Sequence, residues 1–218
     1  MRRIVRTLLS LSGDKARFAR SLADFEDPGL RRRLKAIGDA FLDGYRASLE
    51  EEDPEALAAR VARIDPELWG FAHEGVGLGL CLLDSLPPWR RRFDAFLEGP
   101  GAGQPYMLHV GAGWVLARLP VSPSRFLGRF DPLLRWMALD GFGFHEAFFH
   151  WRRTVERRRL PAWLPAHGRG EFDAGVGRHL WFSPEVEAGR LAERIASFPE
   201  DRQGDLWTEV REACVFSG

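Results

Sequence analysis

Five dipeptides in which proline follows aspartate or serine mark where helices can begin in this sequence. The first side chain of each pair can accept hydrogen bonds from free backbone N–H groups, and proline tolerates the first helical position, where its missing N–H costs nothing. Each pair therefore predicts a helix start. The pairs are Asp27-Pro28, Asp53-Pro54, Asp65-Pro66, Asp131-Pro132 and Ser183-Pro184.

Apolar residues at spacings of three and four extend the first start into a long helix. Such a stripe runs from Leu30 to Leu49 and predicts a helix over Pro28 to Leu49. The segment from Pro66 to Leu86 is apolar on nearly every side, which predicts a central helix buried on most of its faces. Further helices are predicted over 106–119 and 141–159.

Strand signals are almost absent, so the predicted fold class is mainly α. The loops predicted at 98–105, 119–124 and 160–170 are too short to separate domains. We therefore expect a single helical domain over residues 1–218, with 1–26 as a candidate loosely attached segment. The order Asp-Pro, Trp, Gly-Phe, His-Glu occurs twice, from Asp65 and from Asp131, and predicts an internal duplication.

Three glycines interrupt the central apolar segment. Gly75, Gly77 and Gly79 each lower helix propensity by roughly 1 kcal/mol relative to alanine. Close approach of another backbone or of a ligand would account for them, and we favour close helix packing. The stretch from His109 to Trp114 also contains two glycines, and the same interpretation is preferred there over a phosphate loop, because no strand precedes it.

Charge and cysteine content exclude several classes of protein. Lys and Arg total 31 and Asp and Glu total 31, so the electrostatic basis for non-specific nucleic-acid binding is missing. Two cysteines, Cys81 and Cys214, make no disulfide framework, and Cys81 is expected to serve packing. No apolar stretch approaches the roughly 20 residues of a membrane-spanning helix. The basic start lacks a signal-peptide cleavage site. We expect a cytoplasmic protein with both thiols reduced.

Polar residues inside apolar segments are the candidates for chemistry. A charged group in an apolar helix is costly unless it is paired, so each such residue has a partner or a task. Glu146 and His150 are four residues apart and share a helical face, whereas His145 and His150 are five apart and do not form the zinc-protease motif. His167 and His179 are expected at solvent-exposed positions. The candidate catalytic residues are Glu74, His109, His145, Glu146 and His150.

Three interpretations of these residues stay open. Glu146 and His150, joined by Glu74 and by His73 or His109, can ligate iron, manganese or zinc in a helical bundle. The same groups can act as general acids and bases without a metal, which we favour over metal-dependent chemistry. They can also simply pair across helices. In each case we expect the helices carrying Glu74 and Glu146 to pack together, with His109 and His150 close by; no cofactor is assigned.

Aromatic composition bears on the ligand. The chain has 8 Trp and 16 Phe but only 2 Tyr, so large rings are supplied mostly without a phenolic hydroxyl. Such rings fill a core or line an apolar cavity, and the core is the more frequent use.

Several motifs together resemble a bacterial family of unknown function. The resemblance runs from about Asp39 to Trp207 and includes the UnbL-type proteins encoded beside enediyne polyketide synthases and in other specialised-metabolite clusters. The family carries Tyr more often where this chain has His73. The motifs are FAHEG at 71–75, YMLHVGAGW at 106–114, DPLLRW at 131–136, DGFGFHE at 140–146 and FHW at 149–151.

This resemblance implies a role in tailoring a hydrophobic intermediate, of polyene or terpenoid-like character, and implies no reaction type. The alternative is a non-catalytic binding or scaffold subunit of a biosynthetic complex. The expected partners are a hydrophobic small molecule and either further copies of the chain or other biosynthetic proteins. The two classes differ physically, because an enzyme needs its polar residues to converge on a cavity and a scaffold leaves them paired in a filled core.

Overall fold

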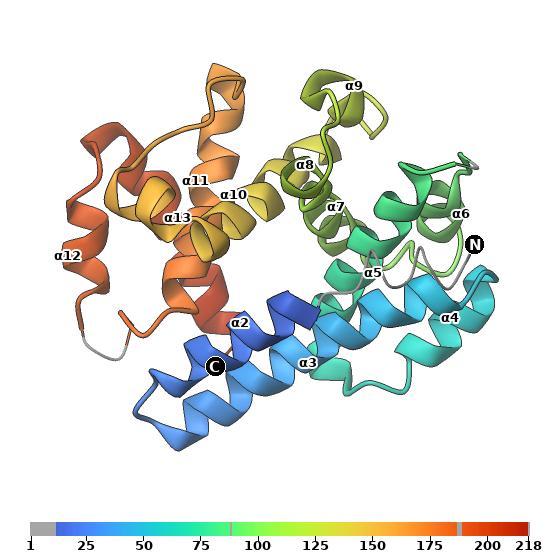
Figure 1. Ribbon diagram of the computed structural model, residues 1–218, viewed down its shortest axis with the longest axis horizontal. Helices are drawn as coiled ribbons and strands as arrows, with labels where there is room; N and C mark the ends of the chain where they lie inside the picture. Colours follow the sequence, from blue (N-terminus) through green and yellow to red (C-terminus); the bar gives the residue numbers. More distant parts are fainter. Residues whose placement is uncertain (1–11, 88, 187–188, 218) are drawn as a thin grey trace.

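The computed structural model describes residues 12–87, 89–186 and 189–217, and every regular element in these ranges is helical (Figure 1). This confirms the mainly α fold class. The α-helices are α2 (Ser12–Ala23), α3 (Pro28–Glu50), α4 (Pro54–Val61), α5 (Trp69–Asp84), α6 (Arg92–Glu98), α7 (Pro105–Gly113), α8 (Val115–Arg118), α9 (Pro123–Leu127), α10 (Met137–Phe149), α11 (Arg169–Trp181), α12 (Leu191–Ala196) and α13 (Glu200–Ser217). Short 3-10 turns are η1 (Pro66–Leu68), η2 (Leu134–Trp136) and η4 (Ala166–Gly168), and η3 (Arg152–Glu156) is a π-helical turn.

Three of the five predicted helix starts are confirmed by their capping geometry. The Asp27 carboxylate accepts the backbone N–H of Gly29 at 2.6 Å, at the start of α3. Asp53 accepts from Ala56 at 3.0 Å and begins α4. Asp65 accepts from Glu67 at 3.1 Å and begins the turn η1, which leads directly into α5.

The other two starts differ from the prediction. Asp131 accepts from the N–H groups of Leu133 and Leu134 at 2.8 and 3.2 Å, but the helical turn η2 begins only at Leu134. No helix begins at Pro184, where residues 184–186 form a turn. The Ser183 hydroxyl instead donates to the Leu180 carbonyl at 2.7 Å. Serine forms such bonds to the preceding turn readily, so it closes α11 here rather than starting a new helix.

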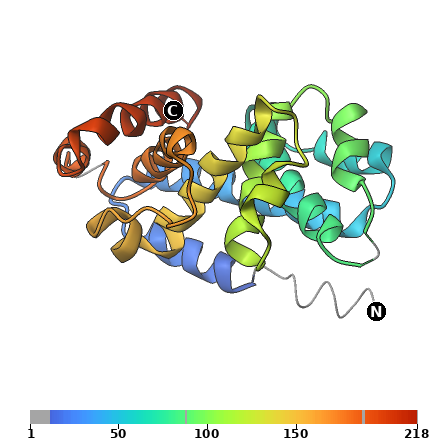
Figure 2. The ribbon, with the colours of Figure 1, turned by 90° about the horizontal axis from the view of Figure 1, so that it is seen from above.

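Six helices pack one on the next in chain order. α3 packs on α5, α5 on α7, α7 on α10, α10 on α11 and α11 on α13. Figure 2 shows this array along the long axis of the molecule, with α4 and α6 near one end and α12 and α13 at the other. α3 runs along one side of the array and also contacts α13, and α2 packs on α3.

Glycine allows this array to be tight. A Cβ atom added at Gly75 or Gly77 would lie under 3.0 Å from a carbonyl oxygen of the neighbouring helix, of Phe41 and Leu108 respectively. At Gly79 it would meet the Ser48 hydroxyl. Close helix packing is therefore confirmed as the reason for these glycines. The same carbonyl contact recurs at Gly44, Gly111, Gly113, Gly141, Gly143, Gly175 and Gly177.

Two predicted helices are interrupted, and five helices, α2, α6, α9, α11 and α13, were not predicted. The helix expected over 106–119 breaks at Trp114, between α7 and α8. The one expected over 141–159 ends at Phe149, because His150 leaves helical geometry (φ −127°) before the π-helical turn η3. In α13 the buried residues Leu206, Val210 and Ala213 recur at helical spacing, so a signal was available there, whereas α11 offered none. α11 is buried nearly all round, which removes amphipathic periodicity.

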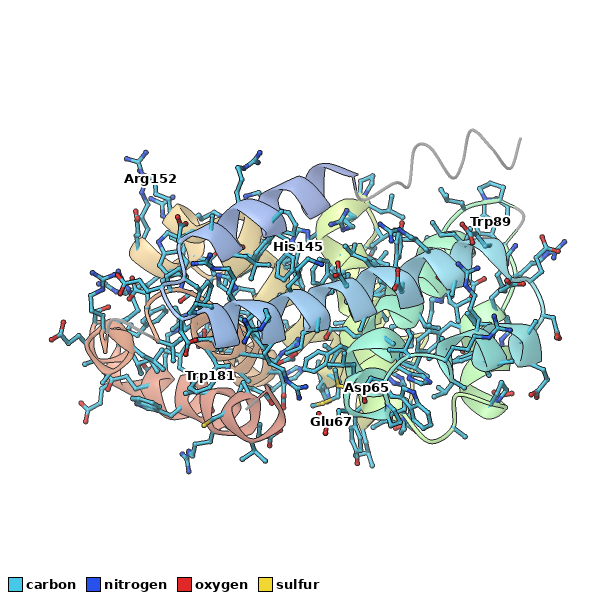
Figure 3. All side chains as sticks on the ribbon, turned by 90° about the horizontal axis from the view of Figure 1, so that it is seen from below. Asp65, Glu67, Trp89, His145, Arg152 and Trp181 are labelled. Atoms are coloured by element: carbon cyan, nitrogen blue, oxygen red, sulfur yellow. The ribbon has the colours of Figure 1, made fainter. Side chains whose placement is uncertain are left out.

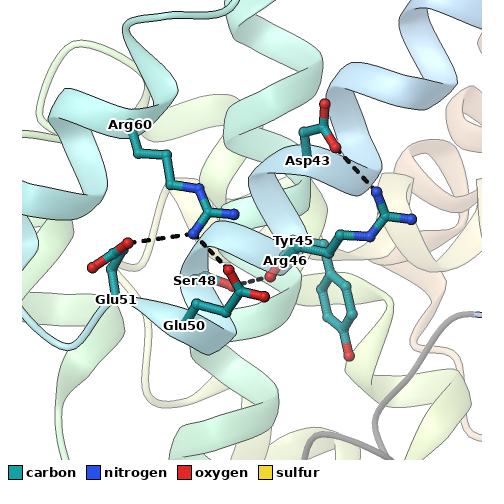
Figure 4. A network of polar contacts seen from close by, with 7 residues as sticks. All are labelled: Asp43, Tyr45, Arg46, Ser48, Glu50, Glu51 and Arg60. Atoms are coloured by element: carbon teal, nitrogen blue, oxygen red, sulfur yellow. Dashed lines mark hydrogen bonds and ion pairs between the residues drawn. The ribbon is translucent and has the colours of Figure 1, made fainter.

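An ion-pair network joins the end of α3 to α4 (Figure 4). The Arg60 guanidinium lies 2.6 Å from the Glu50 carboxylate and 3.3 Å from that of Glu51. Within α3, Asp43 pairs with Arg46 three residues later, at 3.1 Å. These partly exposed pairs contribute little energy each, about 0.2–1 kcal/mol, and mainly orient α4.

The remaining sequence-based expectations concern the ends and the thiols. Residues 1–11 of the segment 1–26 lie outside the described residues, while Phe18 of α2 packs over Gly38 of α3. Cys81 is buried and Cys214 is exposed, and both thiols are free, as expected. None of the helices in the described part of the chain combines the length and apolar character needed to cross a bilayer. The two Asp-Pro repeats both lead through a 3-10 turn into a buried helix that packs on α7, so internal duplication stays a prediction with structural support.

Substitution of the contact glycines tests the packing. Gly111→Ala would place a methyl group against the Glu74 carbonyl, so we expect a loss of about 1–3 kcal/mol or more in the free energy of unfolding. Gly204→Ala is the matched control, because nothing lies within 4 Å of its added Cβ in α13. We expect that variant to gain about 0.5–1 kcal/mol. Urea denaturation of both variants measures the difference, and equal effects would contradict the packing argument.

Candidate functional site

An apolar cavity of about 90 Å³ lies where α2 and α3 face α5, α10 and α11. Aromatic side chains make most of its wall, and the Trp114 ring lies 4.8 Å from that of Phe41 and 5.9 Å from that of Phe144. Only two of the lining residues, Glu74 and Arg178, are charged. The aromatic and aliphatic lining residues are Phe18, Leu34, Ile37, Phe41, Leu42, Phe71, Trp114, Phe144, Phe148, Phe149 and Phe182.

Glu74, Arg178 and Asp140 form one buried ionic cluster beside this cavity. Arg178 donates from Nη1 to Glu74 Oε2 at 3.0 Å and from Nη2 to Asp140 Oδ1 at 2.6 Å. The indole N–H of Trp114 donates to Glu74 Oε1 at 3.2 Å. The Arg178 guanidinium also lies over the Phe144 ring, 4.6 Å from its centre. The relative exposure of Glu74 is 3%, of Asp140 4% and of Arg178 7%, so these charges are compensated by one another rather than by water.

The helix array brings these three side chains together. The carbonyl of Glu74 in α5 abuts Gly111 in α7, and the carbonyl of Asp140 in α10 abuts Gly175 in α11. Arg178 follows one turn after Gly175 on α11. Because the backbones touch without intervening side chains, polar groups from α5, α10 and α11 reach one another across the array.

Burial sets the ionisation of the cluster. Burial raises the pKa of Asp140 to about 8; Arg178 opposes the rise, and Glu209 and Glu74 add to it. Burial alone would lower the pKa of Arg178, but Asp140, Glu74 and Glu209 outweigh it and keep that pKa above its ordinary value. Burial therefore favours the neutral form of Asp140, whereas Arg178 stays charged. One buried atom of each partner, Asp140 Oδ2 and Arg178 Nε, has no hydrogen-bond partner among the described residues.

A second cluster holds Glu146. This carboxylate is 3% exposed and forms an ion pair with Arg153 Nη2. Its Oε1 lies 3.7 Å from both His145 Nδ1 and His150 Nε2. His145, labelled in Figure 3, is buried, and the centre of its ring lies 5.1 Å from that of Trp114 and 4.4 Å from that of Phe149. His150 is half exposed.

His109 lies in a third environment. Its Nδ1 is 2.6 Å from the Pro105 carbonyl one turn earlier in α7, and its ring packs edge-on against those of Phe93 and Phe130. Burial lowers its pKa. His73 makes the same type of contact, with Nδ1 2.7 Å from the Trp69 carbonyl. These two histidines are thus held by their own helices.

The structure therefore distributes the five predicted site residues over three places. Glu74 borders the cavity, His145, Glu146 and His150 lie together, and His109 lies apart from both groups. The expected single cluster of Glu74, Glu146, His109 and His150 is not formed, because α5 and α10 each pack on α7 and each carboxylate pairs with its own arginine. Among the described residues, no three His, Cys, Asp or Glu side chains are grouped so that they could hold a metal ion.

Sequence reasoning missed Asp140 and Arg178, and it misplaced His179. Both missed residues flank Gly-x-Gly segments, Asp140 before Gly141 and Arg178 after Gly177, in the way that Glu74 precedes Gly75. That shared position was an available signal. His179 is 6% exposed, not solvent-exposed as expected, and burial and Arg178 lower its pKa to about 3. His167 is exposed, as predicted.

The raised pKa of Asp140 predicts a specific pH dependence. Since its folded-state pKa lies above the ordinary value of 3.8, its contribution to stability is complete below pH 3.8 and is lost as pH rises through 8. Asp140→Asn keeps a carbonyl acceptor for Arg178 and cannot ionise. We expect its melting temperature relative to wild type to rise by about 3 °C or more between pH 5 and pH 9. Exposed Asp24→Asn is the control, and a parallel shift in both variants would contradict the assignment.

Neither the curated proteins nor the solved structures contain a significant match to this sequence. Residues 1–218 match a protein family of unknown function, DUF1702. With a match that extends over its whole length, the chain belongs to the DUF1702 family.

Proposed function

We propose that this protein binds a hydrophobic small molecule in the cavity bordered by α2, α3, α5, α10 and α11 and takes part in tailoring it. The observation that supports this most is the composition of the wall, which is aromatic and aliphatic except for Glu74 and Arg178. An apolar cavity with a few convergent polar groups is the usual form of a small-molecule site. The proposed ligand class is a polyene or terpenoid-like intermediate of specialised metabolism, and the proposed location is the cytoplasm.

The size of the cavity implies that the ligand displaces part of the wall. A cavity of about 150 Å³ holds one benzene ring, and this one has about 90 Å³. Phe18 of α2 covers the cavity over Gly38, and its ring lies 6.3 Å from that of Phe148. α2 packs mainly on α3, whereas the other wall helices belong to the central array. We therefore propose that movement of α2 admits the ligand.

Glu74 is the residue proposed to perform acid/base chemistry in this cavity. Trp114 and Arg178 each donate to one of its oxygens, so the carboxylate is held in a fixed orientation at the wall. Such a group can transfer a proton to or from an apolar substrate that has no polar group of its own. Glu146 does not line the cavity. We therefore propose Glu74, and not Glu146, as the catalytic carboxylate.

A second candidate function is a non-catalytic binding subunit. The observation that favours it is the mutual pairing of Glu74, Asp140 and Arg178, since a paired buried cluster needs no chemical task. In that case the same cavity binds the ligand without changing it.

Energy transfer from tryptophan tests where the ligand binds. The methyl ester of cis-parinaric acid is a neutral conjugated tetraene that accepts energy from nearby indoles. We expect saturable binding, with much of the transfer lost in Trp114→Phe, because Trp114 lines the cavity. Trp207→Phe is the control, because its half-buried ring lies on α13 outside the cavity wall. Absence of saturable binding, or an equal loss in both variants, would argue against the proposed site.

Absorption of the same tetraene separates the two candidate functions. If Glu74 removes a proton from one carbon of the chain and returns it to another, a double bond moves and the absorption of a conjugated chain changes. For an enzyme we expect a change with wild type that is lost in Glu74→Gln and retained in the exposed control Glu67→Gln. Binding with unchanged absorption in all three proteins would instead support the binding subunit. Melting temperatures identify variants that fail to fold.

A further inference from the structure

A surface hollow adjoins the apolar cavity. Its lining residues run without a gap from Phe148 to Arg153, and Phe148 and Phe149 belong to the cavity wall as well. Beyond these two rings, the hollow presents His150, Arg152 and Arg153, and none of its lining residues is acidic. The rings of Phe148 and Phe149 therefore lie between the apolar cavity and the basic hollow.

Arginine side chains also lie at the rings that separate the cavity from the hollow. The Arg118 guanidinium lies 5.6 Å from the centre of the Trp114 ring and 5.7 Å from that of Phe149. Arg152 is exposed and projects from the edge of the molecule (Figure 3). The π-helical turn at 152–156 departs from α-helical geometry here, and such turns occur frequently at functional sites.

The carboxylates near the hollow do not cancel this charge. Glu146 is buried and its ion pair is with Arg153. Glu156, on the same π-helical turn, is not among the residues that line the hollow. The lining thus holds the guanidinium groups of Arg152 and Arg153 against one buried carboxylate, so it is net positive even with His150 neutral.

The interior end of the cavity offers no comparable attraction to an anion. Arg178 is bonded there to both Glu74 and Asp140, so the cluster as a whole carries no excess positive charge. An anionic group placed beside it would be desolvated and would meet a carboxylate. A charged end of a ligand is therefore favoured at the hollow and disfavoured inside.

We infer that the ligand is an amphiphile whose apolar body occupies the cavity and whose terminal carboxylate or phosphate lies in the hollow, against Arg152 and Arg153. This inference rests on the proposed function and specifies its ligand. Guanidinium groups bind both anions through paired hydrogen bonds, so the chemistry shared by the two is what the site recognises.

Displacement of the neutral tetraene ester by three twelve-carbon competitors tests the inference. Dodecanol, dodecanoic acid and dodecyl phosphate share one apolar chain and differ in their end groups. With wild type at pH 8, we expect one or both anions to displace the probe at about fivefold lower concentration than dodecanol, the advantage of roughly 1 kcal/mol typical of a partly exposed ion pair. Preference for only one anion supports the inference and shows whether the end group of the ligand is a carboxylate or a phosphate.

Charge-removing variants locate the effect. Arg152→Gln removes a guanidinium with no structural partner among the described contacts and should reduce the advantage of the anions while leaving dodecanol unchanged. Arg153→Lys keeps the pairing of Glu146 and tests whether a fork-shaped donor is needed. Arg63→Gln, an exposed residue near α4 at the other end of the array, is the control and should change nothing.

The failures of the inference and of the proposed function are distinguishable. If dodecanol displaces the probe as well as the anions do, or if Arg63→Gln and Arg152→Gln act alike, the anionic end group is refuted and the hydrophobic site stands. If the neutral ester does not bind saturably, the proposed function fails first.

Discussion

Direct backbone contact between successive helices is the constraint on which this structure depends. At each step of the array from α3 to α13, a glycine lies where any side chain would collide with a neighbouring helix, usually with a carbonyl oxygen. Glycine in a helix interior costs roughly 1 kcal/mol, so the tertiary contact must offset that cost at every step. The consequence is that the helices lie very close together. Side chains next to these glycines can therefore contact side chains from helices that are not their immediate neighbours in the array.

The buried charges follow from that closeness. Glu74, Asp140 and Arg178 come from α5, α10 and α11, and their mutual bonds compensate a desolvation that none of them could sustain alone. The same arrangement leaves space between the array and α2, where aromatic rings enclose a small cavity. The paired ionic cluster inside and the basic hollow outside are the basis for the proposal that the two ends of this cavity differ in their preference for a charged ligand group.

Local rules predicted a large part of the fold. The extent of α3 was expected to within one residue, because an Asp-Pro cap and an uninterrupted apolar stripe both depend on neighbours in sequence. The interruption at His150 and the helix α11 were not expected. A π-helical turn and a helix buried on all sides carry no periodic signal, so their residues could be assigned only once their packing was known.

For the candidate site, the sequence by itself determined which residues need a partner: Glu74, Glu146 and the histidines stand among apolar residues, where an unpaired polar group is too costly. Only the tertiary structure decided the partners. Glu74 bonds Arg178, 104 positions away, whereas Glu146 pairs with Arg153 in the next turn of chain and His109 with its own helix. The physical reason is that the cost of burial is a property of one residue, while its compensation depends on which helix the glycine contacts bring within reach.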